Sequence, residues 1–198
     1  LLGFRPIVNK VAPIEFDVSR ASTATRVNRE GLIESVANNI ARVDFADDVN
    51  GSLLLEPQGT NLLTHSNNFL DSIWSKSSTL ITANASISPD GNLNAFNLNN
   101  TSGNASCTHT LGSQPAGTYV FSVFIKATGS DIGKGIGIRF QSNTFAQNNF
   151  ITSSEWQRIS VTMTTTSASV LNPRILVFGV TNAITDVLIF GAQLEQSS

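Results

Sequence analysis

The chain has 198 residues, of which 40% are hydrophobic and only 13% are charged, and its formal net charge is −2. This length allows one sizeable domain with an extension, and the charged share is about half of the usual value for globular proteins. A net charge this small gives no electrostatic basis for binding nucleic acid or an anionic membrane, and no apolar run approaches the roughly 20 residues of a membrane span.

The remaining composition also restricts the class of protein. Ser, Thr and Asn fill the place of the missing charges, which suits a β-rich extracellular or particle-bound module. A single cysteine, Cys107, excludes an internal disulfide. The sequence begins with Leu1 and has no initiator Met, so we expect a fragment of a longer polypeptide.

The first 59 residues are expected to form an extended N-terminal arm. Residues 1–60 hold 14 of the 26 Asp, Glu, Lys and Arg residues of the chain. Their apolar pieces are short, and they cannot bury enough surface to offset the entropy lost on folding. We therefore place a boundary near Gly59, with the arm over residues 1–59 and a second domain over residues 60–198.

Turn and strand signals alternate along the chain. Asn50 and Gly51 predict a turn, because this pair adopts positive φ at little cost. A loop or a single helical turn is expected over residues 67–75. Short strands are predicted at residues 52–56, 60–63, 95–98 and 106–111.

Two segments carry the strongest strand pattern. Residues 118–127 are apolar on both faces, which predicts a strand in the middle of a sheet, whereas residues 156–166 alternate between apolar and polar. Shorter runs of the same kind cover residues 135–140, 174–180 and 186–193. Several strands separated by turns, without a convincing amphipathic helix, predict an all-β fold, an antiparallel β-sandwich.

Three stretches of the chain resemble a known group of proteins. The sequence FDVSRASTATRVN over residues 16–28, with GLIE over residues 31–34, is similar to the opening of bacteriophage tail-fibre and related virion proteins. LLLEPQGTNLL over residues 53–63 resembles a second segment of those proteins, and Ser66, Phe69 and Trp74 match the Ser, Phe and Trp that come after that segment. The ending FGAQLE over residues 190–195 is similar to their last strand.

This resemblance implies a jelly-roll domain like the carbohydrate-binding modules of families 4 and 9, preceded by an arm, on an extracellular phage particle. In that pattern Trp74 and Trp156 occupy core positions. Related modules often hold a structural calcium with an Asp in the last strand, where this chain has IFGA over residues 189–192. We therefore expect no metal site of that kind.

The arm is predicted to serve assembly. Strand-forming segments with unpaired backbone groups need an edge or a neighbour, and phage fibres of this kind commonly form trimers. We expect a homotrimer in which the arm packs between copies of the chain or docks onto another virion protein. The candidate assembly residues are Phe16, Arg20, Arg26, Leu32 and Ile33.

Catalysis and cofactors find little support in the sequence. The only histidines are His65 and His109, and no G-x-S-x-G motif is present to expose a serine nucleophile. Cys107 and His109 would share one face of a strand, but zinc needs three or four ligands. We expect no enzyme activity, no metal and no cofactor.

Glycan binding is the more open question. Sugars are held by aromatic faces and by planar amides, and residues 141–150 combine two Phe with several amides in a predicted loop. The candidate glycan-binding residues are Phe145, Phe150, Asn143 and Asn148. The alternative, that both Phe side chains simply cover the core, stays open.

These observations predict a non-enzymatic virion protein, a tail or head fibre domain, with attachment to a bacterial surface glycan as a second role. One alternative is a carbohydrate-binding module of a secreted bacterial enzyme or adhesin. Another is an enzyme such as a depolymerase, which would need two carboxylates about 5 to 10 Å apart.

Overall fold

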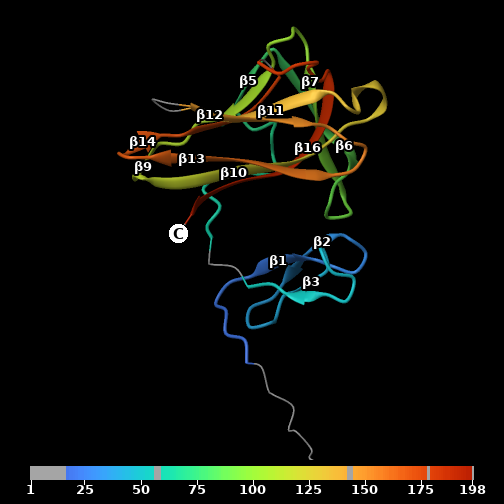
Figure 1. The fold of residues 1–198 in the computed structure, drawn as a ribbon, viewed down its shortest axis with the longest axis vertical. Helices are drawn as coiled ribbons and strands as arrows, with labels where there is room; N and C mark the ends of the chain where they lie inside the picture. Colours follow the sequence, from blue (N-terminus) through green and yellow to red (C-terminus); the bar gives the residue numbers. More distant parts are fainter. Residues whose placement is uncertain (1–16, 56–58, 142–144, 178, 198) are drawn as a thin grey trace, which may run out of the picture. The chain divides into compact units, whose positions relative to one another are not determined.

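The structure is a computed structural model that describes residues 17–55, 59–141, 145–177 and 179–197 (Figure 1). The chain divides into two compact units, Leu1–Leu55 and Glu56–Ser198, called here the N-terminal unit and the sandwich unit. Among the described residues, no helix combines the length and the hydropathy needed to cross a membrane. Phe16 lies outside the described residues.

The N-terminal unit contains two short antiparallel strand pairs. Strand β1 (Ala24–Val27) pairs with β2 (Ile33–Val36), and β3 (Val43–Asp44) pairs with β4 (Ser52–Leu53). The turn predicted at Asn50 and Gly51 is confirmed, since Gly51 has φ of 79° and lies against the ring of Phe45 without space for a Cβ atom.

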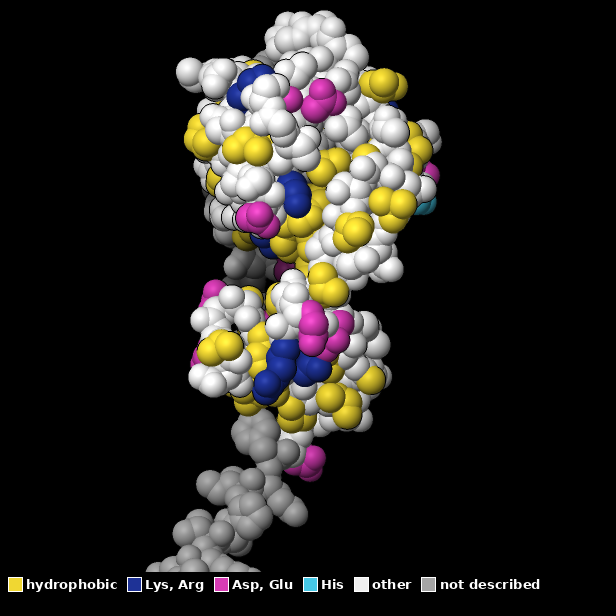
Figure 2. Space-filling view, turned by 90° about the vertical axis from the view of Figure 1, so that its right-hand side faces the viewer, with side chains coloured by type: hydrophobic (Ala, Val, Ile, Leu, Met, Phe, Trp, Pro, Cys, Tyr) yellow, Lys and Arg dark blue, Asp and Glu magenta, His cyan; other side chains and the backbone are white. Residues whose placement is uncertain are grey.

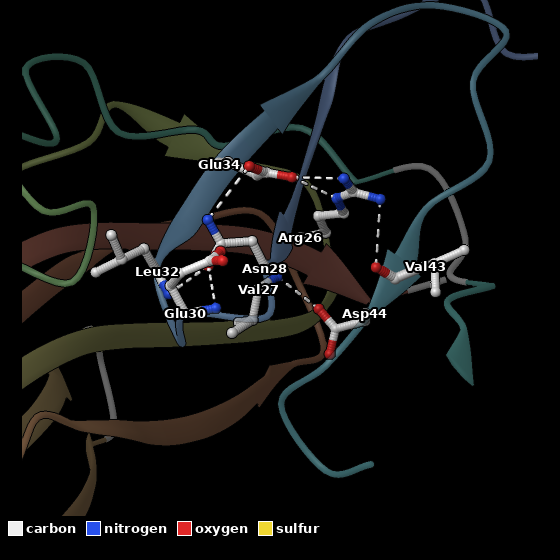
Figure 3. A network of polar contacts seen from close by, with 8 residues as sticks. All are labelled: Arg26, Val27, Asn28, Glu30, Leu32, Glu34, Val43 and Asp44. Carbon is white, nitrogen blue, oxygen red and sulfur yellow. Dashed lines mark hydrogen bonds and ion pairs between the residues drawn. The ribbon is translucent and has the colours of Figure 1, made fainter. Parts of the chain in front are cut away.

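Polar contacts hold these strands together (Figure 3). Arg26 of β1 donates a hydrogen bond from Nε to Glu34 of β2 at 2.6 Å, and this contact lowers the pKa of the Glu34 carboxyl. The backbone N–H of Val27 donates to Asp44 at 2.7 Å and so connects β1 to β3. Val36 is the one buried hydrophobic side chain of the described residues 17–55, so this unit depends on polar contacts more than on a core.

The sandwich unit consists of two five-stranded antiparallel sheets that pack face to face (Figure 1). The strand order is β12-β11-β15-β8-β5 in the first sheet and β13-β10-β16-β7-β6 in the second. Apart from the hairpins β6–β7 and β11–β12, which each stay within one sheet, the chain crosses from one sheet to the other between successive sheet strands, as in a jelly roll. The two-residue strands β9 and β14 pair with each other.

The elements of the sandwich unit have these bounds, in chain order: β5 Trp74–Ser77, β6 Thr79–Ile87, β7 Leu93–Asn100, β8 Ser106–His109, β9 Ser113–Gln114, β10 Gly117–Lys126, the 3₁₀ helix η1 Gly129–Asp131, β11 Gly135–Gln141, β12 Phe145–Ile151, β13 Gln157–Thr165, β14 Ser169–Val170, β15 Asn172–Leu176 and β16 Asp186–Ser197.

The core lies between the two sheets and explains the strand pattern of the sequence. Strand β10 lies between β13 and β16, and its residues Tyr119, Phe121, Val123 and Ile125 are all fully buried. Strand β13, at the edge, buries alternate residues only. The all-β antiparallel sandwich is confirmed, and Figure 2 shows a surface of mostly uncharged polar side chains and backbone on the face that it presents.

Several sequence-based expectations differ from the structure. Residues 60–63 do not form a strand, because Leu62 and Asn61 make only isolated hydrogen bonds to β16. The predicted strand over residues 174–180 ends at Leu176. Strand β6 carries no clear alternation and was not expected. Residues 145–150 of the predicted loop over residues 141–150 belong instead to strand β12 and pair with β11.

The two tryptophans have different environments. Trp74 is 1% exposed, contacts the rings of Phe69 and His109, and donates its indole N–H to the carbonyl of His65 at 3.1 Å. Trp156 precedes β13, is only half-buried, and donates to the carbonyl of Ile87 at 3.2 Å. The core position expected for Trp74 is therefore confirmed, and that expected for Trp156 is wrong.

This difference predicts unequal costs of truncation. Trp74→Ala should lower the free energy of unfolding by about 3 to 5 kcal/mol, because it leaves a large cavity in a packed core. Trp156→Ala should cost about 1 to 2 kcal/mol, because much of that ring already contacts water. Urea unfolding followed by circular dichroism measures both, and equal losses would contradict the assignment.

Candidate functional site

The outer face of the first sheet, which points away from the core, gathers polar side chains from all five strands. Ile138 and Phe140 of β11, Ile175 of β15 and Cys107 of β8 point into the core and are fully buried. Because side chains alternate along a strand, the residues between them point outward. The pairing register then arranges these outward residues in rows across the sheet.

The central row crosses the sheet from edge to edge. It consists of Gln147, Arg139, Arg174, Thr108 and Ser75, each directly opposite the next on the neighbouring strand. Four spacings of roughly 4.8 Å between strands give this row a length of about 19 Å.

Two further rows flank the central one. On one side, Phe145 of β12 lies opposite Gln141 of β11, which lies opposite Asn172 of β15. On the other side the row contains Asn149, Gly137, Leu176, Ser106 and Ser77.

Part of this face is hollowed into a groove with a volume of about 570 Å³. Its lining consists of Ser75, Ser77, Asn104, Ser106, Thr108, Thr110, Asn172 and Arg174. Hydroxyl, amide and guanidinium groups therefore line the groove, and none of these described lining residues is acidic.

Two glycines let the chain close one end of the outer face. The segment after β15 returns along β11, where the N–H of Gly135 donates to the carbonyl of Asn182 at 2.9 Å. A Cβ atom at Gly135 would lie 2.4 Å from Val180, and one at Gly137 would lie 2.9 Å from Leu176. Glycine is required at position 135, where a Cβ atom would also lie 2.6 Å from the backbone carbonyl oxygen of Thr181 in this segment, whereas a Cβ atom at position 137 would meet mainly side chains of the same sheet.

Arg139 and Arg174 stand directly opposite each other on β11 and β15. Arg139 donates from Nε to the Oε1 of Gln147 at 2.8 Å, and its guanidinium lies 4.9 Å from the centre of the Phe145 ring. Burial, and then the charge of Arg174, lowers the pKa of Arg139. The Nε of Arg174 is buried and has no hydrogen-bond partner in the described part of the chain.

This arrangement can bind a ligand that carries many hydroxyl or anionic oxygen atoms. Serine and threonine hydroxyls both donate and accept hydrogen bonds, amides do the same with planar geometry, and guanidinium groups donate in a fixed fork. The ring of Phe145 is 67% exposed beside them and offers a face for stacking.

The structure separates the residues predicted from the sequence to bind a glycan. Phe145 points to the outer face, whereas Phe150 lies on the opposite face of β12 and packs against the core. Asn148 shares the face of Phe150 and donates to the carbonyl of Ser160 in β13 at 3.0 Å. Asn143 lies outside the described residues. The three described residues therefore do not converge on one surface.

The sequence patterns did not identify Arg139 and Arg174 as candidate ligand-binding residues. Each is a polar residue within an apolar run, which is a detectable signal for an outward position in a strand. Their direct pairing brings together segments 35 positions apart, and local sequence patterns do not reveal such pairings.

The residues expected to mediate assembly have internal contacts or partial exposure. Arg20 donates to the carbonyls of Ser22 and Val36, and Arg26 is bound to Glu34. Leu32 is exposed and Ile33 is half-buried. These arginines stabilise their own unit, and the assembly role stays a prediction.

Cys107 and His109 offer no separate reactive site. Burial raises the pKa of the Cys107 thiol to about 12, so it is not a thiolate at neutral pH. The ring of His109 makes an edge-to-face contact with Trp74, and its Nε2 lies 3.2 Å from the carbonyl oxygen of Thr64. Within the described residues, no group of three or more His, Cys, Asp and Glu is placed to hold a metal ion.

No protein-family model matches the chain, and no curated protein matches its sequence. Solved structures of similar fold do exist. The CBM22-1 xylan-binding domain from Paenibacillus barcinonensis Xyn10C aligns with a TM-score of 0.52 and 14% identity, over 72% of this chain and 97% of that domain. The module TmCBM61, solved in complex with β-1,4-galactotriose, aligns with a TM-score of 0.50 and 15% identity, over 70% of this chain and 99% of the module.

A phage protein shares the fold as well. The enzymatically active domain of bacteriophage CBA120 tailspike protein 4 aligns with a TM-score of 0.51 and 13% identity. The alignment covers 69% of this chain but only 21% of the tailspike chain. At these identities the similarity shows a common fold, the jelly roll of carbohydrate-binding modules.

The opposite orientations of Phe145 and Phe150 predict separable effects. Phe150→Ala should lower the free energy of unfolding by about 1 to 3 kcal/mol because its ring packs on the core, while Phe145→Ala should change it by no more than about 0.5 kcal/mol. Thermal unfolding of both variants measures this. A larger loss for Phe145→Ala would place that ring in the core and remove it from the outer face.

Proposed function

We propose that this chain is a non-catalytic glycan-binding protein and that the groove on the outer face of the first sheet is its binding site. The observation that carries the proposal is the groove itself, lined by hydroxyl, amide and guanidinium groups on a jelly-roll sheet. Saccharides present closely spaced hydroxyl groups, and each of these lining groups can hydrogen-bond to them.

The dimensions of the face suit an oligosaccharide. The central row is about 19 Å long, which exceeds the length of a single sugar ring. Phe145 at one end of the neighbouring row supplies the exposed aromatic face on which a sugar ring can stack. Hydrogen bonds along the groove would set orientation, and stacking would add apolar contact area.

The proposed setting is the surface of a phage particle, with the sandwich unit presenting its groove to a bacterial surface glycan. The motifs over residues 16–34 and 53–63 and the shared fold of the tailspike domain support this setting. The N-terminal unit would join copies of the chain into a homotrimer or attach it to another virion protein.

A second setting uses the same groove. The fold shared with modules such as the xylan-binding domain of Paenibacillus barcinonensis Xyn10C also supports a carbohydrate-binding module of a secreted bacterial enzyme or adhesin. Identification of the parent polypeptide separates the two, because a catalytic domain on the same chain would favour the second setting.

A blocking substitution tests the groove. Ser75 is exposed at one end of the central row, and Ser75→Trp would place a bulky ring in the groove. Ser160→Trp, at an exposed position of β13 in the other sheet, is the matched control. On a glycan array followed by calorimetry, Ser75→Trp should weaken binding by at least about tenfold, or roughly 1.4 kcal/mol, and Ser160→Trp should not. Equal binding by both variants would contradict the assignment of the site.

A truncation tests the proposed assembly role. All members of the sandwich core lie between Leu63 and Leu194, so deletion of residues 1–51 should leave a folded sandwich unit. Light scattering should then report a trimer for the full chain and a monomer for the truncated one. If the full chain is monomeric at micromolar concentration and the truncated chain unfolds, the N-terminal unit stabilises the sandwich unit of its own chain and has no role in assembly.

A further inference from the structure

Two arginines lie opposite each other on the outer face of the first sheet, and one of them, Arg174, lines the candidate groove. Arg139 and Arg174 are direct cross-strand partners, and residues in such pairs have Cβ atoms about 4.5 to 5.5 Å apart. Like charges at this separation repel each other and destabilise a sheet. The pKa of Arg139 is lowered mainly by its burial, and the charge of Arg174 lowers it further.

The acidic side chains of the sandwich unit make their contacts elsewhere. Asp131 is buried, and its Oδ1 lies 3.0 Å from the Nζ of Lys134. The Oδ1 of Asp186 accepts a hydrogen bond from the side-chain amide of Asn99 at 2.9 Å. Among the described residues that line the groove there is no Asp or Glu. The positive charge at the centre of this face is therefore not balanced by a lining carboxylate.

Arg174 also has an unused donor. Its Nε is buried and lacks a partner within the described residues, although a buried guanidinium N–H group normally finds an acceptor. Guanidinium groups bind carboxylate, sulfate and phosphate oxygens through two parallel hydrogen bonds, and such charge-assisted bonds are among the strongest in proteins. Arg174 lines the groove, so its guanidinium group supplies both a positive charge and hydrogen-bond donors for an anion.

We propose that the groove binds an acidic glycan, and that Arg174, with Arg139 beside it, holds an anionic oxygen group of the sugar. The group is a carboxylate, a sulfate or a phosphate, which share this chemistry. The inference rests on the proposed glycan-binding function and specifies the class of its ligand. The neutral hydroxyl and amide groups of Thr108, Ser75 and Asn172 would then contact the sugar hydroxyls on either side of the anion.

An array of neutral, carboxylated, sulfated and phosphorylated glycans tests the proposal with the full chain. Binding is expected only to anionic glycans, and the three anionic groups on the array identify which anion is preferred. Binding to neutral glycans alone, or to neutral and anionic glycans equally, would overturn the acidic-glycan proposal and leave the proposed function intact. Binding to no glycan would overturn both.

Substitutions of Arg174 test whether this residue binds the anionic group. With the best anionic ligand, Arg174→Gln should weaken binding by about tenfold or more, as expected for the loss of charge-assisted hydrogen bonds. Arg174→Lys, which keeps the charge and loses the fork, should recover part of the affinity. Arg158→Gln is the matched control, because Arg158 contacts Phe124 and Ser122 on the other sheet.

Two further measurements separate ligand binding from a structural role. Arg174→Gln should melt at the same temperature as the unmodified chain or higher, because it removes a like-charge pair, whereas loss of a stabilising arginine would lower the melting temperature. Affinity for the anionic ligand should also fall as salt is added. Equal affinity of Arg174→Gln and the unmodified chain, or equal weakening by Arg158→Gln, would overturn the proposal.

Discussion

Burial of one face of β11, β15 and β8 is the constraint on which the candidate site depends. Ile138 and Ile175 are direct cross-strand partners and both are fully buried, as is Cys107 opposite Ile175. A shift of β11 or β15 by one residue would move its buried side chains into water and turn Arg139 or Arg174 toward the core. The cost of burying an unpaired charge is large, so the core fixes the register, and the register places Arg139 beside Arg174.

The fold was largely predictable because its signal is local. The apolar character of both faces of residues 118–127 and the alternation along residues 156–166 are properties of single strands, and the structure confirms the central strand β10 and the edge strand β13 that they predict. Strand order and register are not local properties. The rows of the candidate site join β12 and β11, which follow each other in the sequence, to β15, β8 and β5, which lie far from them and from one another, so no pattern within one strand could reveal the rows.

Strand β12 shows why the glycan-binding residues were placed in a loop. Amides are depleted in strands on average, and the Asn and Gln residues between Phe145 and Phe150 made a loop the natural expectation. In this edge strand the amides of the two faces instead make different hydrogen bonds. Gln147 accepts hydrogen bonds from Arg139 on the outer face, while Asn148 bonds to the backbone of β13 beside the core.

The arginine pair also conflicts with what stability alone would favour. Arg139 and Arg174 are direct cross-strand partners, and like charges directly opposite each other destabilise a sheet. Departures from locally favourable chemistry concentrate at functional sites, where the folded protein tolerates a cost that its ligand later offsets. The anionic ligand proposed above would relieve the repulsion only when bound, so part of its affinity would come from removing an unfavourable interaction in the free protein. The pair, rather than any single aromatic side chain, is therefore the feature that most distinguishes this face from an ordinary polar sheet surface.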